Sequence, residues 1–333
     1  MNRRIRAFAL VGPVLGAAVA FHAVAADPAR EVREAQKILA AGEYERAYAE
    51  YQRITEKSGN PLAYFTLALF HQFGWGRAPD RVAACRLHEH AAQGGIPAAE
   101  HFLGDCLAKG VHRTADPARA AFWFQRAADH GHAFSLCRLA ELLIAGEGVA
   151  KDPATGLAKC GKAADLGVAS AMVRMGRFYL EGDLGAVNDE AAVEWFERAA
   201  RAYSVEGAFL LAGMLRDGRG RSADPAAALY WFEAAASQGY APAYFPTAVL
   251  YFNAPLDPET GLPRPANLAK AYMWLSASKA RSGDSAIRAR ASDMLITVLT
   301  AMPESWVPGL DAKVAAHFSA LENAASNGGL ILE

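Results

Sequence analysis

The chain has 333 residues, of which 53% are hydrophobic and 21% are charged, and its formal net charge is -1. A nearly neutral chain lacks the basic surface that binds DNA, RNA or an anionic membrane, so we expect no nucleic-acid partner. This length would ordinarily correspond to about two domains, but an internal repeat breaks that rule and has to be sought first.

Residues 1–25 are predicted to be a cleaved signal peptide. Three arginines precede an apolar run at residues 7–21, and residues 23–25 read Ala-Val-Ala, the small-x-small pattern of a cleavage site. The run is too short to span a membrane. Twin-arginine export stays open because of Arg3-Arg4, although the surrounding residues favour general secretion. We therefore expect a periplasmic or secreted protein, cleaved near Ala25, with no membrane span in the mature chain.

Residues 26–60 are predicted to form a helical hairpin that caps the N-terminal end of the fold. Its helices are expected at residues 31–40 and 44–57, with a turn at Gly42 between them. The Gly-Asn-Pro sequence at residues 59–61 ends this unit.

Residues 61–283 contain a repeat with a period of 36 residues. One column holds a residue that suits a helix N-cap, because its side-chain oxygen accepts from the free N–H groups of the first turn. The column contains Asp80, Asp116, Asp152, Asn188 and Asp224. Each unit is predicted to hold a helix A of about 12 residues, a loop, and a helix B of about 13 residues. Such a hairpin cannot bury its apolar faces alone, so neighbouring units must stack into a solenoid.

A sixth unit fits the period only after a seven-residue insertion in a proline-rich loop at residues 255–265. Asp284 is expected to cap a helix that ends near Ala301. Residues 303–308 should then turn the chain into a last helix at residues 310–323. Residues 284–333 are thus predicted to be a C-terminal helical cap and a short tail.

The repeat resembles the Sel1-like repeats, which are related to tetratricopeptide repeats. The matching residues in three units are Leu103-Gly104 with Gly110-Val111; Gly146, Gly148-Val149 and Asp152; and Met175-Gly176, Tyr179 and Gly182. The resemblance implies an all-α, right-handed α-solenoid with helix A on the concave side. It also implies an adaptor role and no enzymatic activity. Because the matched residues are structural, the resemblance leaves the partner open.

A polar stripe on the A helices is the predicted surface for a protein or peptide partner. Its charged members are Asp105, Arg138, Glu141, Arg174, Arg177, Glu181 and Asp217. Since helix A lines the concave side in Sel1-like arrays, the stripe would lie in a groove. Its mixed charge favours a peptide, a protein surface or a zwitterionic polymer over a polyanion. An ordinary solvated helix face fits the same pattern. We expect the chain to be a monomer.

Four cysteines, Cys85, Cys106, Cys137 and Cys160, are predicted to form two disulfides, because an exported chain meets oxidising conditions. In an antiparallel helix pair, the sequence positions of two residues that face each other add up to a constant. That sum is about 191 between the first helix B and the next helix A, which matches Cys85 with Cys106. It is about 298 within the third unit, which matches Cys137 with Cys160. The alternative is four buried thiols.

Motifs of catalysis are weak. Ser276 and Lys279 fit the Ser-x-x-Lys of penicillin-recognising enzymes, in which the lysine activates the serine, but the companion motifs of those enzymes are absent. A penicillin-recognising enzyme is therefore the runner-up function. A structural scaffold in an envelope polysaccharide or cell-wall assembly complex is the third.

No cofactor or metal is predicted. His88 and His90 are two residues apart on a helix and point to different sides of it, which argues against a shared metal. His101, His130 and His132 are interpreted as helix-surface and turn residues.

Overall fold

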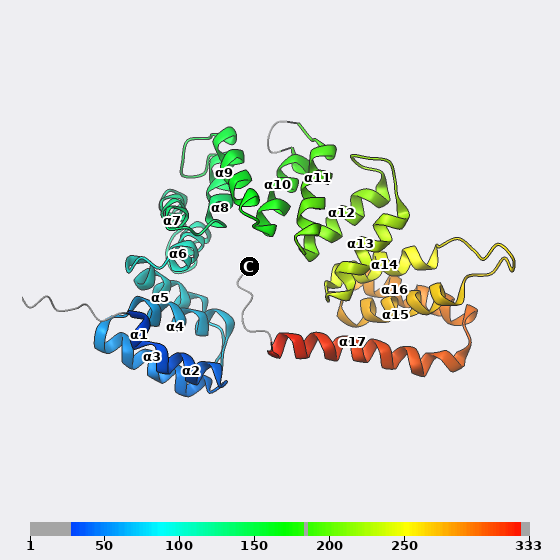
Figure 1. The fold of residues 1–333 in the computed structure, drawn as a ribbon, viewed down its shortest axis with the longest axis horizontal. Coiled ribbons are helices and arrows are strands. Elements are labelled where there is room, and N and C mark those ends of the chain that lie inside the picture. Colours follow the sequence, from blue (N-terminus) through cyan, green and yellow to red (C-terminus); the bar gives the residue numbers. More distant parts are fainter. Residues whose placement is uncertain (1–27, 183–185, 328–333) are drawn as a thin grey trace, which may run out of the picture.

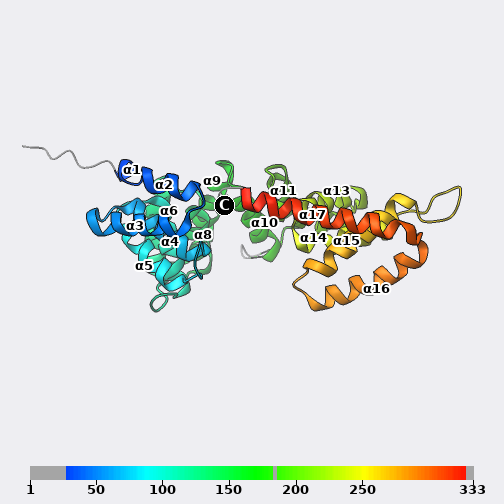
Figure 2. The ribbon, with the colours of Figure 1, turned by 90° about the horizontal axis from the view of Figure 1, so that it is seen from below.

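The computed structural model describes residues 28–182 and 186–327, so the predicted signal peptide lies outside the described residues. In these ranges the chain forms α-helices and one short 3-10 helix, and no strand. Successive helices pack against one another to form an open arc (Figure 1) that is thin when seen from below (Figure 2). The predicted all-α solenoid is confirmed.

The array consists of six helical hairpins. They are α4 (Pro61–Phe73) with α5 (Arg81–Gln93), α6 (Pro97–Lys109) with α7 (Pro117–Asp129), α8 (Ser135–Ala145) with α9 (Pro153–Asp165), α10 (Ala169–Glu181) with α11 (Asp189–Arg201), α12 (Val205–Asp217) with α13 (Pro225–Ser237), and α14 (Ala241–Phe252) with α15 (Pro265–Arg281). Figure 1 shows α6, α8 and α10 on the inner side of the arc, and α7, α9 and α11 on its outer side.

Five of the B helices begin at the predicted N-cap column. Each side chain there accepts a hydrogen bond of 2.9–3.0 Å from the backbone N–H three residues further on. Such a cap stabilises a helix by about 1 kcal/mol relative to alanine. The glycine column that ends the preceding A helices has φ between 65° and 76°, the left-handed conformation that glycine adopts without strain. These two columns maintain the 36-residue register.

Helical caps close both ends of the array. At the N-terminal end, α1 (Pro28–Glu31), α2 (Arg33–Ala40) and α3 (Tyr44–Ser58) precede α4. At the other end are α16 (Ser285–Ala301), the 3-10 helix η1 (Glu304–Trp306) and α17 (Val307–Asn327). Helix α17 runs back across the open side of the arc (Figures 1 and 2).

The last helix starts earlier than predicted. It begins at Val307, so Pro308 lies in its first turn and not in the preceding loop. Proline is tolerated there because the first-turn N–H groups have no partner within the helix.

The buried core is divided along the array into three clusters. The first joins α2, α3 and α4, the second runs from α5 to α8, and the third extends from α8 to α17. In α13, Phe232 is buried and Trp231 packs partly buried against the same cluster, so these aromatic residues are structural. Each cluster depends on neighbouring hairpins, as expected for a solenoid.

Candidate functional site

The predicted polar stripe contains a ladder of ion pairs that joins three inner helices. Asp105 of α6 accepts from Lys109 at 3.2 Å and from Arg138 Nε of α8 at 2.9 Å. Arg138 also pairs with Glu141, one turn further along α8. Glu141 lies 2.7 Å from Arg174 Nε of α10. These five residues form one series of alternating charge, which we call the charge ladder.

The remaining stripe residues are also paired. Arg177 of α10 lies 2.6 Å from Glu206 of α12 and 3.6 Å from Glu181. Asp217, at the end of α12, is held by the adjacent Arg216 at 2.7 Å. The structure therefore assembles the stripe into the charge ladder, the Arg177 cluster and a separate Asp217 pair. A partner that used these charges would have to compete with intramolecular ion pairs.

The charge ladder is partly buried, and this affects its two carboxyl groups differently. The side chains of Asp105, Arg138 and Glu141 are only 21–24% exposed. Burial opposes the ionisation of Asp105, but Arg138 and the other nearby cations outweigh it and lower its pKa. For Glu141, burial outweighs its two arginines and raises its pKa. Glu141 is therefore the first of the two to take up a proton as the pH falls.

Beyond α10 the inner-helix column changes from charged to apolar. Leu210 and Gly213 of α12 occupy the repeat positions of Arg174 and Arg177, and Pro246 of α14 follows Leu210 in its column. All three line a cavity of about 240 Å³, which we call the C-terminal recess; the Arg216–Asp217 pair and Arg219 also line it. A Cβ atom at Gly213 would meet no atom within 4 Å. The recess was not predicted from the sequence, because it arises where the charged side chains of the column are lost.

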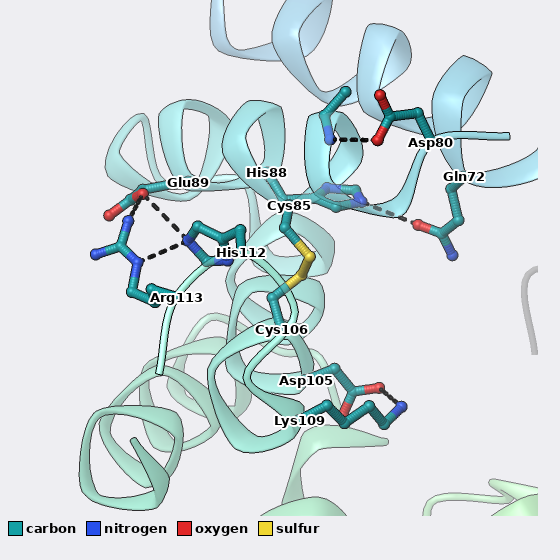
Figure 3. The surroundings of a disulfide bond; sticks show 11 residues. Gln72, Asp80, Cys85, His88, Glu89, Asp105, Cys106, Lys109, His112 and Arg113 are labelled. Atoms are coloured by element: carbon teal, nitrogen blue, oxygen red, sulfur yellow. Dashed lines mark hydrogen bonds and ion pairs between the residues drawn. A yellow bond between two sulfur atoms is a disulfide. The ribbon is translucent and has the colours of Figure 1, made fainter. Parts of the chain in front are cut away.

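A second cavity, of about 130 Å³, lies between α4, α5 and α6. The Cys85–Cys106 disulfide and Phe102 form part of its lining, and Arg81 and Lys109 bring positive charge to it. We call it the disulfide pocket; Figure 3 shows its disulfide. Asp105 also lines it and pairs with Lys109, so the pocket combines apolar groups with charges of both signs.

Both predicted disulfides are confirmed. Cys85 and Cys106 have Cα atoms 5.9 Å apart and join α5 to α6. Cys137 and Cys160 have Cα atoms 4.2 Å apart and join α8 to α9. Among the described residues no cysteine is free. The alternative of four buried thiols is therefore rejected.

The interpretation of His101 as a surface residue is wrong. Its ring is 5% exposed and contacts Phe124 and Phe134, with centroid distances of 5.5 and 5.1 Å. The repeat position of His101 explains its burial. The equivalent residue is Phe65 one repeat earlier and Cys137 one repeat later. His101 Nδ1 lies 3.0 Å from Ser135 Oγ, which satisfies one ring nitrogen. Burial lowers the pKa of His101 to about 3, so the ring is neutral at physiological pH.

His88 is also a buried core residue. It is 1% exposed, its ring stacks on Phe102 at a centroid distance of 4.7 Å, and its Nε2 lies 2.9 Å from Gln72 Oε1. Burial lowers the pKa of His88 to about 3. His130 and His132 do lie at the turn after α7, where His130 pairs with Glu100 at 2.9 Å.

The Ser-x-x-Lys residues lie in the packed helix α15. Ser276 is half-buried there and Lys279 is exposed. Across the described part of the chain, no hydrogen bond joins the two side chains, and neither lines the disulfide pocket or the C-terminal recess. The structure therefore provides no observation that favours the penicillin-recognising alternative.

Two solved structures are similar to this protein in fold. One is a protective antigen present in uropathogenic Escherichia coli strains, with 23% identity, a TM-score of 0.59, and 87% of this chain and 61% of that chain covered. The other is a Sel1 repeat protein from Oxalobacter formigenes, with 23% identity, a TM-score of 0.56, and 78% and 99% covered. The chain thus spans 61% of the length of the E. coli antigen. A search of curated proteins found no match.

The Sel1 repeat family matches six segments of the chain. They are residues 61–96, 97–132, 133–168, 169–204, 205–240 and 259–281. The first five segments are 36 residues long, which is the period found in the sequence. Sel1 repeats generally serve as scaffolds for protein–protein interaction. Because the match covers more than half of its length, the chain belongs to the Sel1 repeat family.

Proposed function

We propose that this protein is an exported scaffold that binds a partner protein or peptide along the inner helices of its solenoid. The observation that carries the proposal is the change along these helices from the charge ladder to the C-terminal recess. A partner that places charged groups along α8 and α10 and one apolar side chain in the recess would match both parts. Concave solenoid surfaces commonly bind extended partners in this way.

Export is part of the proposal. The two disulfides suit an oxidising compartment. The N-terminal sequence, which lies outside the described residues, has the pattern of a signal peptide. Within the described ranges, no helix is long and apolar enough to cross a membrane.

The C-terminal recess gives the sharper test of the binding surface. Gly213 is in a helix and a side chain there meets open space, so Gly213→Leu should fill the recess without disturbing the fold. Leucine also has a better helix propensity than glycine by roughly 0.8 kcal/mol, so the variant should not lose stability. We expect Gly213→Leu to weaken partner capture at least tenfold, because it removes the pocket for an anchor side chain.

The charge ladder and the Arg177 cluster are tested together by reversing Arg174 and Arg177 to glutamate. The double variant should lose partner capture from a periplasmic extract while its helical circular dichroism is unchanged. Its matched control is Arg198→Glu, which also breaks an ion pair between repeats, with Asp165 at 2.9 Å, but on the outer helices α9 and α11. Undiminished capture by both the double variant and Gly213→Leu would reject the inner helices as the binding surface.

A further inference from the structure

His112 is an unusual neighbour for a disulfide. Its side chain is 2% exposed, and it lies beside Cys85–Cys106 in Figure 3. The Sγ atoms of Cys85 and Cys106 and one ring nitrogen of His112 all lie within 4.8 Å of one another. The three residues come from α5, from α6 and from the loop after α6. Among the described residues, no other cluster of this kind could hold a metal ion.

The two nitrogens of His112 have different surroundings. Nε2 accepts a hydrogen bond from Arg113 Nε at 2.8 Å and lies 3.6 Å from a carboxylate oxygen of Glu89. Nδ1 is buried and has no hydrogen-bond partner in the described part of the chain. Burial, reinforced by Arg113, lowers the pKa of His112, so its ring is neutral and can act as a metal ligand. An unsatisfied buried nitrogen costs free energy unless it serves another purpose.

We propose that Cys85, Cys106 and His112 form a latent Zn²⁺ site that becomes available when the disulfide is reduced. Two thiolates and one imidazole are a donor set typical of zinc and unsuited to calcium or magnesium. In the bound state, His112 Nδ1 ligates the metal and Nε2 carries the ring proton, so Arg113 Nε has to give up its hydrogen bond to Nε2. Glu89 then accepts from Nε2, which is the usual arrangement of a carboxylate behind a zinc-bound histidine.

The step from disulfide to metal site balances with a dithiol as the reductant. The dithiol gives two electrons and two protons to the Cys85–Cys106 bond and becomes a disulfide, and the protein gains two thiols. Zn²⁺ then displaces the two thiol protons and binds both sulfurs. The Cα atoms, 5.9 Å apart, can remain in place because rotation about the Cα–Cβ bonds separates the sulfurs. The fourth ligand would be a water molecule from the disulfide pocket, which both cysteines line.

The site would keep α5 and α6 joined under reducing conditions, with the metal in place of the covalent bond. The second disulfide supplies an internal comparison, since no histidine or carboxylate completes a metal site at Cys137–Cys160 within the described residues. The proposal does not depend on partner binding along the inner helices.

Cobalt binding to the full chain tests the proposal. After reduction with a phosphine, the chain should bind one Co²⁺ with thiolate-to-cobalt charge transfer and tetrahedral d–d bands, and Zn²⁺ should displace it. The oxidised chain should bind none. Replacing Cys137 and Cys160 with serine should leave this binding unchanged, whereas replacing Cys85 and Cys106 should abolish it. We expect His112→Ala to weaken binding at least tenfold, and Glu89→Gln to weaken it about tenfold.

Three results would overturn the proposal. They are the absence of a thiolate–cobalt band in the reduced chain, binding that survives in the Cys85→Ser/Cys106→Ser variant, and full affinity in His112→Ala. Circular dichroism of each oxidised variant establishes that it is folded before reduction. If reduction unfolds the chain, Zn²⁺ should restore the helical signal; failure to do so is a fourth result that would overturn the proposal.

Discussion

Lowering the pH should destabilise this protein through its buried histidines, above all His88 and His101. His88 and His101 have pKa values of about 3 in the folded chain, below the unfolded value of about 6.5. Above the unfolded pKa neither state binds the proton. As the pH falls below the unfolded pKa, the two histidines bind protons in the unfolded chain but stay neutral in the folded chain, which favours unfolding. Between pH 7 and pH 5 each histidine should therefore cost on the order of 2 kcal/mol of unfolding free energy.

The local contacts of His88 support this direction. Its Nε2 faces the Gln72 amide oxygen and therefore carries the hydrogen, which leaves Nδ1 as the site for a second proton. Nδ1 is buried without a partner in the described structure, so a protonated ring would have a donor with no acceptor. Protonation would also place a charge beside Phe65 and Phe102, whose centroids lie 5.8 and 4.7 Å from the ring.

The assay is urea unfolding of the oxidised chain at pH 7 and pH 5, followed by circular dichroism. His88→Phe keeps an aromatic ring in the same stack and cannot titrate, so it should reduce the loss between the two pH values by about 2 kcal/mol. The matched control is His90→Phe, which removes one histidine at an exposed position of the same helix. The reasoning is refuted if His88→Phe and the parent chain lose the same stability between pH 7 and pH 5.

Three further predictions concern the backbone and the disulfides. Tyr203 has φ 64° in a column that otherwise holds glycine, and it is 85% exposed. Tyr203→Gly should therefore stabilise the chain by about 1 kcal/mol in urea unfolding, and a loss of stability would contradict this. Gly104→Ala should lower the unfolding free energy by about 1–3 kcal/mol, since its Cβ would lie 2.6 Å from the Phe124 ring. Gly213→Ala should not destabilise the chain, and equal effects of the two substitutions would refute the packing argument. Serine in place of both cysteines of the Cys137–Cys160 disulfide should cost roughly 3 kcal/mol, checked by the shift of the urea midpoint with and without reductant.

The fold could be predicted from sequence because its determinants are local and repeat. The N-cap at Asp152 and the left-handed glycine at Gly146 each act within one turn of their own helix. Five N-cap residues and five such glycines, each set repeated every 36 residues, therefore specify the hairpin and its stacking. The same regularity made the disulfides predictable, since a fixed helix length determines which residues face each other.

The surface features could not be predicted as easily, because they depend on contacts between helices. The sequence indicates that Arg138 is charged, but only the structure shows that it bridges Asp105 and Glu141. The C-terminal recess results from a missing side chain at Gly213, which gives no positive signal in a search for reactive residues. The surroundings of His112 depend on how the loop after α6 folds back on α5, and no local pattern specifies that contact.

The two disulfides differ in their relation to the divisions of the core. The first core cluster ends at α4 and the second begins with α5, and Cys85–Cys106 belongs to neither, although both of its residues are buried. Cys137 and Cys160 both belong to the third cluster, and their disulfide joins α8 to α9 within one hairpin. In a solenoid each repeat is held only by its neighbours, so a break in the apolar core is where local opening would begin. Cys85–Cys106 couples two repeats next to such a break, because it joins α5 to α6. Cys137–Cys160 instead fixes the two helices of one hairpin against each other, so it stabilises a single repeat.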